Sequence, residues 1–243
     1  MMITRTFLIM LFLTGSLLGY SQVFITGGSI TYERKIQMHK ILAANKWFKG
    51  NMGEIPKFYT SKFMLRFNSD TTVYSKVEED NTNNTPSWAI YARENESVNI
   101  FSKNLSVVKK TVYSDDFIIK DSLPHYQWKL VNETRRIAGV ECKKATTIIN
   151  DSIFIVAFYA ENIPVSGGPE QFSGLPGMIL GIAVPRLHVT YYAQKVETNE
   201  KQQIVIPKQK NKSMNRKEFQ EMVLKNMKWA FDNSGIGALY LFL

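Results

Sequence analysis

The sequence predicts a mainly β fold with some α-helix: a curved antiparallel sheet, or an open half-barrel, packed by a C-terminal helix. Two observations predict it. Many short β-type runs follow one another with polar turns between them, which favours an antiparallel meander that curls into a sandwich or open barrel. An amphipathic helical pattern follows the last of these runs. Because no repeat or low-complexity linker divides the chain, we expect one β-rich domain over residues 22–243.

The first 21 residues have the three parts of a secretory signal peptide. Arg5 is their only charged residue, an apolar run covers residues 7–18, and Gly19 and Ser21 supply the small residues of a cleavage site. A membrane-spanning helix needs about 20 apolar residues, so this run is too short and we expect cleavage after Ser21. The alternative is a retained membrane anchor. The cleaved chain is expected in the periplasm or outside the cell, and not as an integral membrane protein.

The first clear strand pattern lies at residues 59–67. Apolar side chains alternate there with polar ones, and Lys62 and Arg66 fall on the polar face. This period of two places one face on a core and the other in water. Residues 68–70 form a predicted turn, and residues 71–75 begin the returning strand.

Further β-type runs follow along the chain. A polar loop is predicted at residues 81–86, and a hairpin turn at residues 150–152. The remaining runs are residues 88–93, 98–102, 105–113, 117–120, 126–131, 145–149, 153–159, 178–184 and 187–196. Their close spacing supports the antiparallel meander.

Two helices are predicted. Residues 39–48 have apolar side chains near helical spacing, directly after an alternating stretch at residues 30–38. A C-terminal helix is expected to begin with Ser213 as its N-cap, since the hydroxyl can accept a backbone N–H, and to end at residues 233–235. Its apolar stripe consists mainly of Phe219, Met222, Val223, Met227 and Ala230. We expect this stripe to pack on the sheet, and the alternative is a partner-binding face.

Residues 161–184 depart from the alternating pattern. Two tight turns surround Phe172, and Pro176 and Gly177 fit a type II turn in which glycine supplies a positive φ. Loops carry function more often than cores do. The candidate binding loop therefore consists of Gly168, Pro169, Phe172, Gly174, Leu175, Pro176 and Gly177. The alternative is that this loop only closes the sheet.

Residues 174–179 read Gly-Leu-Pro-Gly-Met-Ile. They resemble the naming motif of the GLPGLI family of exported bacterial proteins, with Met178 in place of a leucine. Segments at residues 30–34, 55–58, 128–145, 157–159, 163–164 and 168–169 also resemble the family. Other departures from its pattern are Phe158 and Gly181. The resemblance implies export but no mechanism, and a lipoprotein-carrier-like fold is an analogy from the strand count and the terminal helix.

The chain is basic, with a formal net charge of +9. A basic protein attracts acidic partners, and outside the cytoplasm these are anionic glycans, lipid head groups and acidic protein surfaces. Exported proteins rarely meet nucleic acid, so no nucleic-acid partner is expected. The lysine-rich stretch at residues 201–217 is interpreted as a solvated linker.

The sequence contains no recognisable catalytic or metal-binding constellation. Cys142 is the only cysteine, cannot form an internal disulfide, and is interpreted as a packed thiol on a strand. As a nucleophile it would need a base from His39, His125 or His188, and none of these lies in a known signature. Their spacing does not suit a metal site either. We therefore predict no catalytic residue, no metal and no cofactor.

These observations favour a non-enzymatic binding or accessory protein of the cell envelope. Its curved sheet would hold an apolar ligand or a segment of an envelope protein. Two alternatives stay open. One is an exported hydrolase with a dispersed active site, and the other is a structural subunit of an outer-membrane complex.

Overall fold

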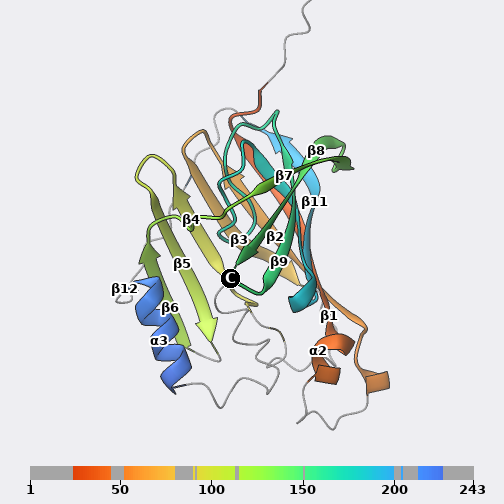
Figure 1. The fold of residues 1–243 in the computed structure, drawn as a ribbon, viewed down its shortest axis with the longest axis vertical. Coiled ribbons are helices and arrows are strands. Elements are labelled where there is room, and N and C mark those ends of the chain that lie inside the picture. The colour runs from red at the N-terminus through yellow and green to blue at the C-terminus, as the bar shows by residue number, and fades with distance from the viewer. Residues whose placement is uncertain are drawn as a thin grey trace, which may run out of the picture.

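The computed structural model describes residues 24–44, 52–79, 90, 92–112, 115–149, 151–199, 204 and 213–226. They form one open sheet in the order β12-β6-β5-β4-β3-β2-β1-β11-β10-β9-β8-β7 (Figure 1). The strands are β1 (Gly28–Gln37), β2 (Phe58–Phe67), β3 (Thr71–Glu79), β4 (Glu96–Ile100), β5 (Leu105–Val112), β6 (Asp115–Asp121), β7 (Lys129–Ile137), β8 (Val140–Ile149), β9 (Ile153–Ala160), β10 (Met178–Val184), β11 (Val189–Thr198) and β12 (Ser213–Met214). The helices are α2 (Met38–Ala44) and α3 (Arg216–Asn226), with short 3-10 turns η2 (Met52–Glu54) and η4 (Pro185–Leu187). The predicted fold class is confirmed.

Strand β1 joins the two halves of the sheet. It pairs antiparallel with β2 on one side and with β11, about 160 residues later, on the other. All neighbouring strands pair antiparallel except β12, which pairs parallel to β6 through Ser213 and Ile118. This last pairing brings the C-terminal helix α3 back to the edge of the sheet, beside β6 (Figure 1).

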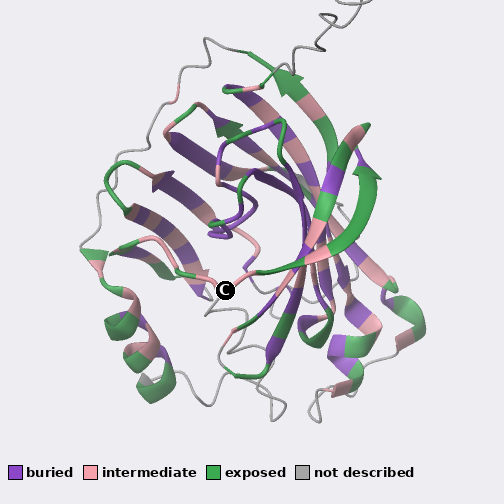
Figure 2. Cartoon of the chain, turned by 45° about the horizontal axis from the view of Figure 1, so that its top comes forward, coloured by how far each residue is buried: buried purple, intermediate pink, exposed green. Residues whose placement is uncertain are grey.

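Four register shifts occur along the described sheet, with the extra residues on β11, β3, β7 and β10. An extra residue in one strand bends it and increases its twist, so these bulges account for the curvature seen in Figure 2. On β1 the buried side chains are Ile30, Tyr32, Arg34 and Ile36, and the residues between them are only partly buried. We call the face of the sheet to which these four side chains point the inner face.

The core consists of two large apolar clusters and a smaller one. One apolar cluster contains Ile36 and Tyr191, and a second contains Tyr32 and Phe63. Figure 2 shows buried residues concentrated on the central strands and exposed ones on α3. Helix α3 covers a third, smaller cluster through Phe219 and Val223, packed on Val108, Val112 and Ile119 of β5 and β6. The predicted packing of the apolar stripe on the sheet is thus confirmed for Phe219, Met222 and Val223, whereas Met227 and Ala230 lie outside the described residues.

Several predicted elements differ from the observed ones. Residues 92–94 form a turn where a strand was expected over 88–93, and residues 123–128 have no regular secondary structure before β7 begins at Lys129. The predicted helix at 39–48 is seen as α2, whose last residue is Ala44. The hairpin around residues 150–152 is confirmed by the antiparallel pairing of β8 with β9.

Some expectations fall outside the described residues. They are the signal peptide at residues 1–21, the polar loop at 81–86, most of the lysine-rich stretch at 201–217, and the helix end at 233–235. Among the residues that are described, no helix is long and apolar enough to cross a membrane.

The N-terminus of α3 is capped by Asn215, so the expectation that Ser213 caps it is wrong. The backbone N–H of Glu218 donates to Asn215 Oδ1 at 2.9 Å, and the N–H of Asn215 donates to Glu218 Oε2 at 2.9 Å. This reciprocal pair is a capping box, with Glu218 three residues after the cap. Ser213 lies two residues before this cap and belongs to β12 instead.

Replacing Asn215 with alanine is expected to lower the free energy of unfolding by about 1 kcal/mol, because the backbone N–H of Glu218 in the first helical turn loses its partner Asn215 Oδ1. The matched control is Ser213→Ala, for which we expect a change below about 0.5 kcal/mol. Urea unfolding followed by circular dichroism measures both. A larger cost at Ser213 than at Asn215 would contradict this assignment of the cap.

Candidate functional site

The segment between β9 and β10, residues 161–177, lies against the inner face of the sheet. Its backbone is tied to the start of β10: Met178 N donates to Ile163 O at 2.9 Å and Ile179 N donates to Gly167 O at 2.8 Å. Ile163 and Val165 are buried in the same cluster as Tyr32. We call residues 161–177 the inner segment.

The candidate binding loop lies within the inner segment, and most of it is buried. Gly174 and Pro176 are exposed, whereas the other five of its seven residues are buried. Phe172 is only 1% exposed and packs against Tyr126, with ring centroids 5.4 Å apart. A direct binding role for this loop stays a prediction, but Phe172 itself is an anchor inside the core.

Residues 123–128, which precede β7, pack against the inner segment through Tyr126 and Trp128. The indole N–H of Trp128 donates to Ser173 O at 2.8 Å, and the Tyr126 and Trp128 rings are 5.6 Å apart. Phe172 completes this row of three aromatic rings. These contacts explain why residues 126–128 look like part of a strand in the sequence although they pair with none.

Glu170 connects the inner segment to three elements of the inner face. Its carboxylate accepts hydrogen bonds from Asn95 Nδ2 at 3.2 Å and from the Tyr191 hydroxyl at 3.1 Å, and its carbonyl accepts one from the Ser97 hydroxyl. Its φ of 57° is in the left-handed region, where residues other than glycine are uncommon. Such a conformation persists only where surrounding contacts hold it.

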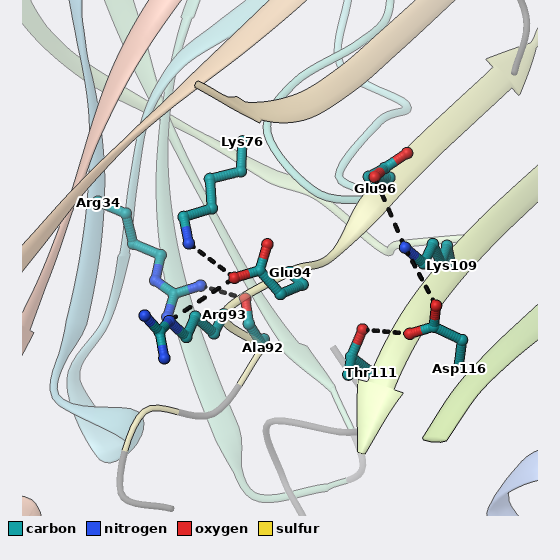
Figure 3. Close-up of polar contacts among 9 residues, drawn as sticks. All are labelled: Arg34, Lys76, Ala92, Arg93, Glu94, Glu96, Lys109, Thr111 and Asp116. Carbon is teal, nitrogen blue, oxygen red and sulfur yellow. Dashed lines mark hydrogen bonds and ion pairs between the residues drawn. The ribbon is translucent and has the colours of Figure 1, made fainter. Parts of the chain in front are cut away.

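The same polar row continues through the turn before β4 (Figure 3). Arg34 donates to Ala92 O, and its guanidinium lies 5.5 Å from the centre of the Phe63 ring. Lys76 Nζ forms an ion pair with Glu94 at 2.7 Å. We call Arg34, Lys76, Glu94, Asn95, Glu170 and Tyr191 the polar belt. It fixes the turn at residues 92–95 and the inner segment in one arrangement.

A second set of ion pairs in Figure 3 lies on β4, β5 and β6. Lys109 Nζ is 3.2 Å from Asp116 and 3.9 Å from Glu96. A hydrogen bond from Thr111 is the main cause that lowers the pKa of Asp116. These groups are partly exposed to solvent, so each pair contributes little to stability.

Lys110, the residue after Lys109, points inward and is 3% exposed. Burial lowers the pKa of its ammonium to about 8. The negative charge of Glu170 opposes this effect on the pKa, and the positive charge of Arg216 reinforces it. Burial also raises the pKa of the Tyr126 hydroxyl, and Arg216 and Glu170 act on that group too. Lys110, Tyr126, Glu170 and Arg216 therefore share one electrostatic environment.

A cleft with a volume of about 430 Å³ opens beside this environment. Its walls come from residues 124–127, the end of β8, the inner segment and the first turns of α3. The polar side chains that line it are His125, Gln127, Asp151, Gln171, Arg216 and Gln220. Tyr126 and Ile148 supply its aromatic and apolar walls.

Arg216 is fixed at the cleft by three hydrogen bonds. Its Nη2 donates to Ser122 O at 3.1 Å and to Gln171 Oε1 at 3.4 Å, and its backbone N–H donates to Asp121 Oδ2 at 3.0 Å. The last bond is the largest cause that lowers the pKa of Asp121. The inner segment thus reaches the cleft through Gln171, which is not among the predicted residues of the candidate binding loop.

The cleft offers hydrogen bonds of both kinds. Each glutamine side chain has an amide that donates and a carbonyl that accepts, arginine only donates, and an ionised aspartate only accepts. This set, beside an aromatic ring, suits a neutral ligand with hydroxyl and amide groups. Across the described parts of the chain, no group of three or more His, Cys, Asp or Glu side chains could hold a metal ion.

Cys142 and the histidines lie in separate places. Cys142 is fully buried in the cluster of Tyr32 and Phe63, and burial raises the pKa of its thiol to about 12. His39 is hydrogen-bonded to Ile55 O at 2.8 Å, whereas His125 lines the cleft. The interpretation of Cys142 as a packed thiol agrees with this environment.

Fold and cleft together define a class: a β-rich, sandwich-like domain built on one open curved sheet, with a polar cleft at its rim. More narrowly, the chain belongs to the family described as N-glycanase peptide, N-terminal domain, of the PNGase F-II type, whose family model matches residues 49–222.

Solved structures support the fold. Two structures of PNGF-II, in space groups C2 and P21, match with TM-scores of 0.52 and with 18% and 17% sequence identity. In both cases the match covers 82% of this chain and 33% of the PNGF-II chain, so this chain spans about a third of their length. At this identity the likeness shows the fold alone. No curated protein matches the chain.

The resemblance to the GLPGLI family is wrong, because the family model that matches is that of PNGase F-II. The residues of the hexapeptide have local structural roles. Leu175 is buried, and an added Cβ at Gly177 would lie 2.2 Å from Ala160 O. The predicted type II turn is also wrong, since the glycine with positive φ (92°) is Gly174 and not Gly177. The burial of Leu175 and the close approach of Gly177 to the Ala160 backbone account for this hexapeptide, so membership of the GLPGLI family is not needed to explain it.

Proposed function

We propose that this chain is an exported, non-catalytic binding domain whose cleft holds the glycan-bearing part of a glycoprotein. The observation that carries the proposal is the lining of the cleft: three glutamine amides, Arg216 and Asp151 around a tyrosine ring. These groups match the hydroxyl and acetamido groups of a sugar. The family description, N-glycanase peptide, supports a glycan linked to asparagine. Export rests on the signal peptide predicted at residues 1–21.

The apolar ligand expected from the sequence has less support. The inner face, where such a ligand would lie, is covered by the inner segment with Phe172 and Leu175 buried. The polar belt holds that segment in place. A polar ligand in the cleft at the rim of the sheet requires no displacement of the inner segment or of the polar belt. An envelope protein is compatible with this proposal where it carries the glycan.

A soluble glycopeptide carrying an N-linked chitobiose core tests the proposal by calorimetry. We expect the double variant Gln127→Ala, Gln220→Ala to bind about tenfold more weakly, because two hydrogen bonds of roughly 0.7 kcal/mol each are lost. Lys217→Ala is the matched control, since this neighbour on α3 is 86% exposed and lies outside the cleft. Equal affinities of the double variant and the wild type would overturn the proposal, as would no binding by the wild type.

The same glycopeptide tests the hydrolase alternative. After prolonged incubation with the protein, mass spectrometry is expected to find it intact. Release of the glycan would instead favour an enzyme with a dispersed active site.

A further inference from the structure

A second, smaller cavity lies away from the cleft, where β1, β2, β10 and β11 meet α2. Its volume is about 250 Å³, and it shares no lining residue with the cleft. Lys35, Lys40 and His188 line it, together with Gln37, Thr190 and Phe58. No aspartate or glutamate does. We call this cavity the basic pocket.

The cationic groups of the basic pocket have little acidic compensation. Glu33 is the one carboxylate paired with Lys35 among the described residues, and its oxygen is 3.9 Å from Lys35 Nζ, at the limit of an ion pair. Lys35 and Lys57 both place their ammonium groups over the Phe58 ring, at 5.3 and 5.7 Å from its centre. Positive charge is therefore gathered around one aromatic wall.

His188 is held in the basic pocket by its backbone. Its N–H donates to Pro185 O at 3.1 Å, and its carbonyl accepts from Gln37 N at 2.9 Å. It is the C-terminal cap of η4, has a left-handed φ of 53°, and directly precedes the first residue of β11. Burial and the charge of Lys40 lower the pKa of its imidazole. An anion in the pocket would act in the opposite direction.

We propose that the basic pocket binds a single oxyanion group, a phosphate or a sulfate, carried by a ligand outside the cytoplasm. Lysine ammonium groups donate up to three hydrogen bonds each, and the Gln37 amide and the Thr190 hydroxyl add neutral donors. A volume of about 250 Å³ holds one tetrahedral oxyanion with a few waters, each of about 30 Å³. The small volume of this partly open cavity favours a small group over a flat lipid surface.

Nuclear magnetic resonance of the chain tests the proposal through its three histidines. Inorganic sulfate and inorganic phosphate are titrated at constant ionic strength against sodium chloride, and imidazole signals are assigned with single His→Gln variants. We expect the His188 signal to shift and saturate with each anion, and the pKa of His188 to rise, because a bound anion favours imidazolium and opposes the effects of burial and of Lys40. The signal of His125, in the cleft, should not respond.

The double variant Lys35→Gln, Lys40→Gln is expected to bind sulfate and phosphate about tenfold more weakly, and Lys217→Gln to bind them as the wild type does. Equal responses of His188 and His125, or an unchanged affinity in the double variant, would show general screening and overturn the proposal. Binding to phosphatidylglycerol vesicles without any response to the free anions would also overturn it, in favour of a membrane surface. None of these outcomes depends on the glycan-binding proposal.

Discussion

Replacing Gly177 with alanine is expected to lower the free energy of unfolding by about 3 kcal/mol. An added Cβ would lie 2.2 Å from Ala160 O and 2.7 Å from Ala160 C, both backbone atoms. Neither can move alone, because Ala160 pairs with Met178 at the junction of β9 and β10. The strands or the inner segment must therefore shift. Urea unfolding followed by tryptophan fluorescence measures the change.

Gly139→Ala is the control that separates crowding from backbone conformation. Gly139 has a positive φ of 80°, but nothing lies within 4 Å of an added Cβ. Its replacement is expected to cost about 1 kcal/mol, the penalty of a side chain in the left-handed region. If both variants lose the same stability, the close approach at Gly177 is not the cause of its requirement for glycine.

The sequence predicts this fold best where one face of a strand is buried and the other is not. Residues 59–67 alternate, and the observed strand β2 covers Phe58–Phe67 with the same side chains inside. A similar alternation predicts a strand from residue 126, although residues 126–128 pair with no strand. Tyr126 and Trp128 alternate there with polar residues, but their partners are Phe172 and the Ser173 carbonyl rather than a neighbouring strand.

Local competition explains the error at the start of α3. Ser213 and Asn215 can both cap a helix, but only Asn215 has an acidic residue three positions later. The reciprocal bonds with Glu218 decide between them. That spacing is visible in the sequence and would have identified the cap.

The cleft could not be predicted in the same way. Its polar groups come from residues 125–127, 151, 171 and 216–220, which no periodic pattern connects. They meet because β12 pairs with β6 and because Arg216 bonds to Asp121 and Ser122 at the end of β6. The inner segment attracted notice through its glycines and prolines, whereas the residues that reach outward or hold it in place are Gln171 and Glu170.

Replacing Phe172 with alanine is expected to lower the free energy of unfolding by roughly 3–5 kcal/mol, the usual cost of removing a buried phenylalanine. The side chain is 1% exposed, packs on Tyr126 and belongs to the cluster of Ile179 and Ile182. Pro176→Ala is the matched control, because Pro176 is exposed in the same candidate loop and its replacement should cost below about 0.5 kcal/mol. Thermal and urea unfolding measure both variants.

Phe172→Leu distinguishes an anchor from a binding residue. Leucine fills most of the site, so we expect a cost nearer 1.5 kcal/mol and an unchanged affinity for the glycopeptide. Phe172→Ala should weaken binding indirectly, because the cavity loosens the neighbouring Gln171 at the cleft. If Phe172→Leu abolished binding while keeping its stability, the ring itself would contact the ligand. The inner segment would then have to open, and the polar belt around Glu170 would be the contact that resists opening.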